Sequence, residues 1–287
     1  MNLADALTMT PISSLDLSRY VTVPTSATVA ETVAAMRNGE RSCACILDGE
    51  TLTGVFTQRD VLQRAIGQPD NWSTPIVSQL GGPPKTISND RSVADAIEVM
   101  NRWWIRDLAV IGANDGFVGN LSYWTVMQTI TNLLASRIDE PHQVPAVRDG
   151  LDFVDFTGLN LHPPVMIDQH ESLDVAVHHL RNRGISQLLV VDHREHLVGT
   201  LSEFDLQMKV GCEVADLNSL TLADVMTAPP KAIAVRSPVS RAIAALVDNV
   251  DSNVALLAET KRPAGVASFR DITAYLESSI EALTATT

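Results

Sequence analysis

One short phrase recurs along the chain and contains the residues whose types could do chemistry. It begins with glycine, has serine or threonine three residues later, and in three of its four copies has aspartate three residues after that; the copies run 54–60, 119–125, 199–205 and 265–271. A hydroxyl and a carboxylate at the start of a helix can cap the free amides, and a helix N-terminus can also bind an anion. The phrase therefore predicts helix starts and leaves open whether an anionic ligand binds there.

The spacing of the phrase indicates internal repeats, which decide the fold wherever they occur. Its glycines are Gly54, Gly119, Gly199 and Gly265, and they are separated by 65, 80 and 66 residues. Two similar intervals on either side of a longer one indicate that the four units are paired, the first with the second and the third with the fourth. We number them units 1 to 4.

Each copy of the phrase follows the same sequence of expected elements. A serine or threonine upstream should cap the first helix of each unit, because these residues accept hydrogen bonds from free helix amides. The expected caps are Thr28, Ser92, Ser172 and Ser237. The expected first strands cover 20–23, 85–87, 165–167 and 232–235, and the second strands cover 43–47, 108–111, 188–191 and 254–257. Every unit is thus predicted to run strand, helix, strand, strand, helix, which is a small α/β fold.

The composition excludes several classes of protein. The 287 residues are 45% hydrophobic and 19% charged, with a formal net charge of −13. This charge argues against a non-specific nucleic-acid binder, which needs surplus Lys and Arg, but it does not exclude one small anionic ligand. No apolar run approaches the roughly 20 residues of a membrane span, and the N-terminus lacks a secretory signal. The expected location is the cytoplasm.

Four paired units of this plan resemble cystathionine-β-synthase (CBS) domains, two of which form a Bateman module. Two such modules in one chain are similar to the regulatory γ subunit of AMP-activated protein kinase. The resemblance covers residues 2 to 280. It implies a first module over 1–138 (units 2–68 and 74–138), a connecting segment over 139–160, and a second module over 161–287 (units 161–211 and 220–280).

The resemblance also implies a ligand, because the clefts of a Bateman module can hold adenine nucleotides. In the family the aspartate of the phrase accepts hydrogen bonds from the ribose hydroxyls, and the serine or threonine faces the phosphates. The pairs that fit are Thr57/Asp60, Ser202/Asp205 and Ser268/Asp271. In unit 2 the acid is replaced by Thr125, next to Trp124, so we expect that site to be empty or altered. The same residues could instead be helix caps only.

Phosphate groups need basic partners, and the guanidinium fork of arginine suits them best. The candidates are Arg41, Arg59, Arg106 and Arg270. Arg59 and Arg270 directly precede two of the aspartates, whereas the other two arginines lie just before second strands. Module 2 has Ser186 and Ser252 at the latter place, so its phosphate contacts are expected to be weaker. Any of these arginines could instead be a solvated surface charge.

The sequence favours a regulatory protein that binds AMP, ADP or ATP, with S-adenosylmethionine as a possible alternative, and acts on a separate partner protein. No cofactor is expected, and a homodimer is possible. Two alternatives remain: an interaction scaffold whose sites are reduced to helix caps, and an enzyme of unrecognised type, for which no nucleophile can be named.

Two further features complete the set of expectations. Cys43 and Cys45 alternate along an expected strand, and we interpret them as small buried thiols rather than metal ligands.

Trp103 and Trp104 end the first helix of unit 2. One of them is expected in the core, and the other is expected to meet a partner or the opposite module.

Overall fold

The computed structural model of the chain describes residues 3–135, 156, 163–247, 253–258 and 262–275. Apart from Phe156, the expected connecting segment lies outside these residues. Phe156 is buried, and its amide donates a hydrogen bond to the carbonyl of Val235 in unit 4 over 3.2 Å. The predicted boundaries of the units and modules stay predictions.

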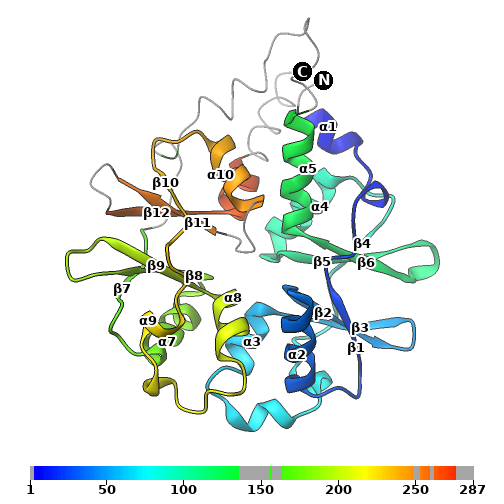
Figure 1. Cartoon of the computed structure of the whole chain (residues 1–287). Helices are drawn as coiled ribbons and strands as arrows, with labels where there is room; N and C mark the ends of the chain where they lie inside the picture. Colours follow the sequence, from blue (N-terminus) through cyan, green and yellow to red (C-terminus); the bar gives the residue numbers. More distant parts are fainter. Residues whose placement is uncertain (1–2, 136–155, 157–162, 248–252, 259–261, 276–287) are drawn as a thin grey trace, which may run out of the picture.

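Four three-stranded sheets form the framework, one for each unit (Figure 1). Their strands are β1 Val21–Pro24, β2 Cys43–Asp48, β3 Thr51–Thr57, β4 Thr86–Ser88, β5 Asp107–Ile111, β6 Phe117–Ser122, β7 Met166–Asp168, β8 Gln187–Val191, β9 Leu197–Ser202, β10 Ala232–Ala234, β11 Asn253–Leu257 and β12 Pro263–Ser268. In every sheet the first strand runs parallel to the second, and the second pairs antiparallel with the third.

Helices connect and cover these sheets as the sequence predicts. The first helices of the units are α2 Val29–Gly39, α4 Val93–Trp103, α7 Leu173–Arg183 and α10 Val239–Val247. The second helices are α3 Gln58–Arg64, α5 Tyr123–Ala135, α8 Glu203–Asp205 with a π-helical turn Leu206–Val210, and residues 269–275. Short helices α1 Leu3–Met9 and α9 Leu222–Val225 lie ahead of units 1 and 4. The expected caps Thr28, Ser92 and Ser172 each accept a backbone hydrogen bond at a helix start. The α/β plan of strand, helix, strand, strand, helix is confirmed.

In units 2 and 3 the repeated glycine lies where the chain of the paired unit crosses it closely. We call the residues just before the first strand of a unit its lead-in. A Cβ atom on Gly119 of unit 2 would lie 2.8 Å from the carbonyl oxygen of Leu17, in the lead-in of unit 1. A Cβ on Gly199 of unit 3 would lie 2.4 Å from Met226 Sδ, in the lead-in of unit 4. The lead-ins are thus exchanged within each pair, which explains the pairing inferred from the spacing.

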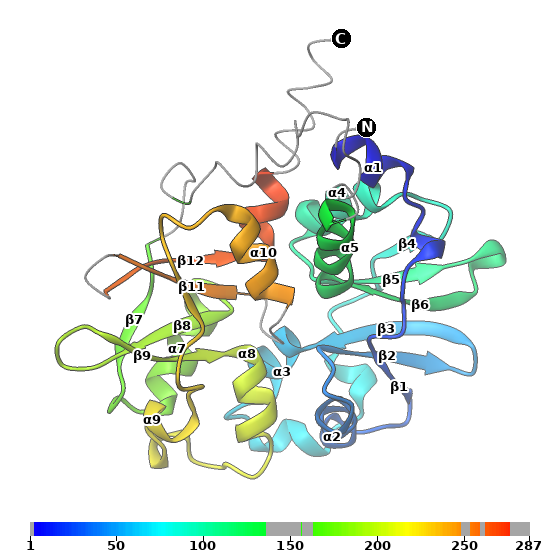
Figure 2. The same cartoon turned by 45° about the horizontal axis from the view of Figure 1, so that its top comes forward.

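The two modules are joined through two hydrophobic cores. Units 1 and 3 share one core, where α3 meets the segment after β9, and units 2 and 4 share the other, where α5 meets α10 (Figures 1 and 2). Polar contacts add to both joints: Arg181 donates to the carbonyl of Leu62 over 2.7 Å, and Trp124 Nε1 donates to the carbonyl of Val247 over 2.8 Å. Each module is therefore held by its partner at both ends, and the four sheets surround a common centre.

Candidate functional site

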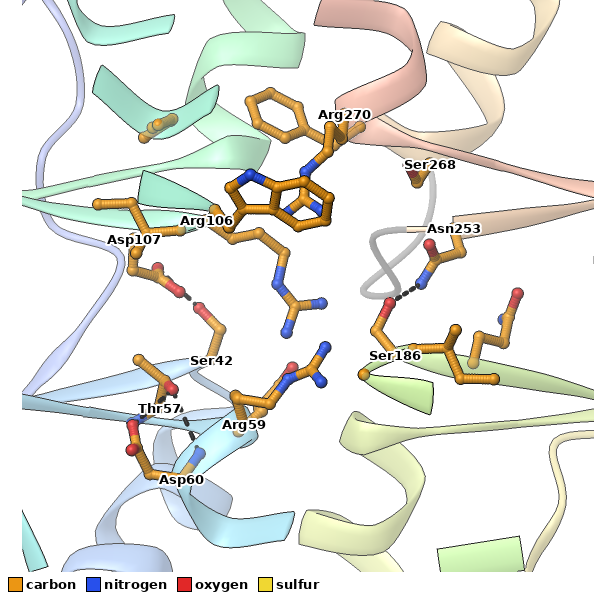
Figure 3. A pocket seen from close by; sticks show the side chains of 18 of the residues that line it. Ser42, Thr57, Arg59, Asp60, Arg106, Asp107, Ser186, Asn253, Ser268 and Arg270 are labelled. Atoms are coloured by element: carbon orange, nitrogen blue, oxygen red, sulfur yellow. Dashed lines mark hydrogen bonds between the residues drawn. The ribbon is translucent and has the colours of Figure 1, made fainter. Parts of the chain in front are cut away.

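A cavity of about 860 Å³ lies at this centre and is lined by residues of all four units (Figure 3). Its walls include the apolar side chains of Val55, Ile105, Val165, Ile185 and Val266. The volume falls within the range of roughly 300–1,000 Å³ that small-molecule sites occupy. The centre of the molecule can thus hold a nucleotide-sized ligand.

Two copies of the phrase line this cavity, those of units 1 and 4. Asp60 Oδ2 accepts hydrogen bonds from the amide and hydroxyl of Thr57 over 2.9 and 2.7 Å. Asp271 Oδ2 accepts the same two bonds from Ser268 over 2.7 and 2.6 Å. Both pairs are therefore helix caps, as one interpretation of the sequence expects. The capping bonds use only Oδ2. Asp60 Oδ1 lies 3.3 Å from Arg64 Nε, and this partly exposed ion pair leaves the oxygen able to accept a further hydrogen bond, as Asp271 Oδ1 also can.

Three of the four candidate arginines reach the cavity. Figure 3 shows Arg59 and Arg106 extending between the two modules, with Arg270 entering from unit 4. Burial is the main cause that lowers the pKa of Arg59 and of Arg270, and the positive charge of Arg106 lowers both further. Like charges held this close in a partly desolvated space favour an anion between them.

The charge of the lining is unusual for this chain. The charged residues that line the cavity are Arg59, Lys85, Arg106, Arg183 and Arg270, with Asp60, Asp107 and Asp271. Cations outnumber carboxylates there, although the whole chain has a formal net charge of −13. Positive charge is therefore concentrated where the four units meet, as an anion site requires.

A glutamate that the sequence analysis missed holds two of these arginines. Glu203, the first residue of α8, is only 2% exposed. Its carboxylate lies 2.5 Å from Arg59 Nε and also pairs with Arg106 Nη2. Burial lowers the pKa of Arg106, but the charge and hydrogen bond of Glu203, together with Tyr123 and Asp107, outweigh burial and raise that pKa. The only signal in the sequence was an acid at the first helical position, which helix starts favour for other reasons.

The copy of the phrase in unit 3 is closed by its own surroundings. Asp205 is only 2% exposed, and neither it nor Ser202 lines the cavity. Its Oδ2 accepts the capping bonds of Ser202, and its Oδ1 accepts from Lys209 Nζ over 2.6 Å and from Thr227 Oγ1 over 2.5 Å. Thr227 belongs to the exchanged lead-in of unit 4. The acid predicted to bind ribose is thus surrounded by donors of the protein itself.

The copy in unit 2 is closed in another way. The Thr125 hydroxyl lies 3.1 Å from Ser122 Oγ and donates to the carbonyl of Asp16 over 3.2 Å. The hollow beside it measures about 10 Å³, which is room for one water molecule. The guanidinium of Arg19 lies over the Trp124 ring at 4.0 Å there, and Arg41 lines this hollow instead of the large cavity.

Trp103 and Trp104 differ from the expectation. Neither is in the core: the two residues are 52% and 70% exposed. Trp104 lines the cavity, and the guanidinium of Arg270 lies 3.7 Å from the centre of its ring. Because Arg270 belongs to unit 4, the expected contact with the opposite module is confirmed for Trp104, whereas the expected core position is wrong. Trp104 is a flat, exposed surface at the cavity on which a base could stack.

Asp107 is a partly buried acid in the cavity wall. Burial raises its pKa above the usual 3.8, although hydrogen bonds from Asn120 and Ser42 oppose the shift. An acid whose pKa is raised by folding stabilises the fold below its unfolded pKa, and this contribution is lost as pH rises through the folded pKa.

The variant Asp107→Asn cannot ionise and keeps an acceptor oxygen for both hydrogen bonds. The free energy of unfolding of the variant minus that of the wild type should therefore increase as pH rises from about 4 to about 7. Denaturant titrations of both proteins across that range test this prediction. The prediction would be contradicted if this difference between the variant and the wild type stayed constant or fell with pH.

Cys43 and Cys45 are buried and free, in agreement with their interpretation as packed thiols. Within the described residues, no group of three or more His, Cys, Asp or Glu side chains could hold a metal ion. The helices of the described part include none that is both long and apolar enough to span a bilayer.

Comparisons with known proteins agree with this architecture. The family model described as "CBS domain" matches residues 12–67, 77–132 and 158–210, which is more than half of the chain. A crystal structure from Methanocaldococcus jannaschii, of a protein proposed to be an archaeal homologue of g-AMPK, is similar with a TM-score of 0.74 at 13% identity, covering 91% of this chain and 98% of that one.

Two further proteins are also similar to this chain. An uncharacterised conserved protein from Pyrococcus horikoshii has a TM-score of 0.57 at 14% identity, covering 89% of this chain and 95% of that one. An uncharacterised 17.7 kDa protein from Acidianus ambivalens is 20% identical over 133 residues, which are 46% of this chain and 80% of the relative. The fourth unit lies outside the matched ranges but has the same sheet as the other three. The chain belongs to the CBS-domain family, with four units arranged as two Bateman modules.

Proposed function

We propose that the protein binds an adenine nucleotide in its central cavity and that the occupied form regulates a partner protein. The observation that carries this proposal is the meeting of two hydroxyl–carboxylate pairs and three arginines in one cavity between the modules. AMP, ADP and ATP are the preferred candidates, and S-adenosylmethionine is the alternative.

The chemistry of the lining supports this class of ligand. The second oxygens of Asp60 and Asp271 can accept hydrogen bonds from ribose hydroxyls, and such charge-assisted bonds are stronger than neutral ones. Guanidinium groups bind phosphate oxygens through two parallel N–H donors. The apolar walls and the Trp104 ring suit a base. One cavity therefore offers a partner for each part of a nucleotide.

A regulatory role follows from the position of the cavity. A ligand there contacts both modules, so it stabilises the arrangement of the modules to which it binds more tightly. We propose that a partner protein recognises that arrangement, and a second copy of the chain is one candidate. The cytoplasmic location and the absence of catalysis stay predictions from the sequence.

Calorimetric titration of the nucleotide-stripped protein with AMP, ADP, ATP and S-adenosylmethionine tests the proposal. We expect saturable binding of one or two molecules per chain, because two copies of the phrase face the cavity and two are closed. Three or more equal sites would show that the closed copies open in solution. No heat and no thermal shift with any of the four compounds would overturn the proposal and favour the scaffold alternative.

A further inference from the structure

Glu203 occupies a position that no other copy of the phrase reproduces. The residue after the serine or threonine is Gln58 in unit 1, Tyr123 in unit 2 and Phe269 in unit 4, so only unit 3 places an acid there. Glu203 belongs to module 2, whereas both arginines that it pairs with, Arg59 and Arg106, belong to module 1. A single buried carboxylate thus holds two cations across the junction of the modules.

The contact is incomplete in one respect. Glu203 Oε1 is buried and, among the described residues, receives no hydrogen bond of good geometry, although Arg59 Nε is only 2.5 Å away. Charge attraction therefore holds this side of the pair without a well-directed donor. The Arg59 side chain keeps 35% of its surface exposed, and the residue lines the cavity. Its guanidinium is close enough to solvent to exchange the carboxylate for another anion.

Carboxylate and phosphate oxygens bind guanidinium in the same way, through the same planar fork of N–H donors. A phosphate in the cavity and the Glu203 carboxylate must therefore share Arg59 and Arg106 or compete for them. They also repel each other, and this repulsion grows in proportion to the charge of the ligand. Glu203 therefore weakens the binding of a triphosphate more than the binding of a monophosphate.

Building on the proposed function, we propose that Glu203 is an internal anion that competes with the ligand for Arg59 and Arg106. It thereby sets the preference of the cavity for ligands of low negative charge, nucleoside monophosphates over triphosphates. Arg270, which stacks on Trp104, is the member of the arginine cluster that this carboxylate does not hold. It is available to the first phosphate group without displacement of Glu203.

The variant Glu203→Gln tests this proposal, since glutamine keeps the size of the side chain and removes its charge. AMP, ADP and ATP are titrated into the wild type and the variant. We expect the wild type to bind AMP more tightly than ATP. The variant should bind AMP about threefold more tightly and ATP about thirtyfold more tightly, with ADP between them, because the lost repulsion scales with ligand charge.

The matched control is Glu213→Gln. Glu213 also forms an ion pair across the modules, with Arg37 over 2.9 Å, but it is exposed and its arginine, unlike Arg59 and Arg106, does not line the cavity. Its loss should leave the affinities for all three nucleotides unchanged. An equal change of affinity in both variants would show that any weakened junction of the modules has this effect, and it would overturn the proposal.

The outcomes separate this inference from the proposed function. If nucleotides bind but the ratio of the ATP and AMP dissociation constants stays the same in Glu203→Gln, the inference fails and the proposed function stands. If neither protein binds any nucleotide, both fail. If Glu203→Gln does not fold, it is combined with Arg59→Gln in a double variant, which removes one charge of each sign. The double variant should then bind ATP more tightly than Arg59→Gln alone, because Arg106 is released, and an unchanged affinity would overturn the proposal.

Discussion

Replacing Asp205 with alanine should lower the free energy of unfolding by about 2–4 kcal/mol, the largest loss among the acids of the phrase. Asp205 is buried and accepts hydrogen bonds from Ser202, Lys209 and Thr227. Removing it leaves the Lys209 ammonium without its counter-charge, and that side chain is 38% exposed, so water reduces the penalty. Denaturant unfolding of the variant and the wild type, followed by circular dichroism, measures the loss.

Asp95→Ala is the matched control for this experiment. Asp95 forms the same capping box with Ser92, with bonds of 2.9 and 2.8 Å, but its cationic partner is the exposed Arg91 at 2.7 Å, and it does not line the cavity. Its loss should cost about 1 kcal/mol, the usual value of a helix cap. Equal losses in the two variants would mean that Lys209 and Thr227 add nothing to Asp205.

Asp60→Ala and Asp271→Ala should each weaken nucleotide binding by about 1–3 kcal/mol, which is roughly 5- to 150-fold. Each change removes the carboxylate oxygen that we assign to the ribose hydroxyls, and each lowers the stability by only about 1 kcal/mol through the lost cap. Calorimetric titration with AMP measures the affinity. Thermal unfolding of the same samples shows that the proteins stay folded at the temperature of the titration.

Asp95→Ala also serves here, because it loses the same capping bonds at a distance from the ligand. Its affinity for AMP should equal that of the wild type. If Asp60→Ala and Asp271→Ala keep the wild-type affinity and lose only stability, these acids are helix caps and the binding role assigned to them is wrong. If only one of the two weakens binding, the ligand occupies one half of the cavity.

The four units could be predicted because their elements depend on local patterns. The caps Thr28, Ser92 and Ser172 precede apolar residues at helical spacing, and the strands are short apolar runs bounded by turns. Local hydrogen bonding and side-chain periodicity largely decide such elements before distant contacts form. For that reason the predicted strand, helix, strand, strand, helix agrees with the structure in all four units.

The candidate site was predicted less evenly, because its state depends on residues far away in the sequence. Asp60 and Asp205 belong to the same phrase, yet one lines the cavity and the other is enclosed. The difference comes from Thr227, which lies 22 positions from Asp205 and reaches it only through the exchange of lead-ins. No pattern within the phrase distinguishes the two aspartates.

The sequence by itself determined the repeats, their pairing and the sheets, and it singled out the candidate ligand-binding residues, since these follow from spacing and local chemistry. Only the tertiary structure decided which copies of the phrase share the central cavity. It also decided that Glu203 of module 2 holds Arg59 and Arg106 of module 1. The physical reason is that charge pairing and burial act through space, so the modules had to meet before these groups acquired their partners.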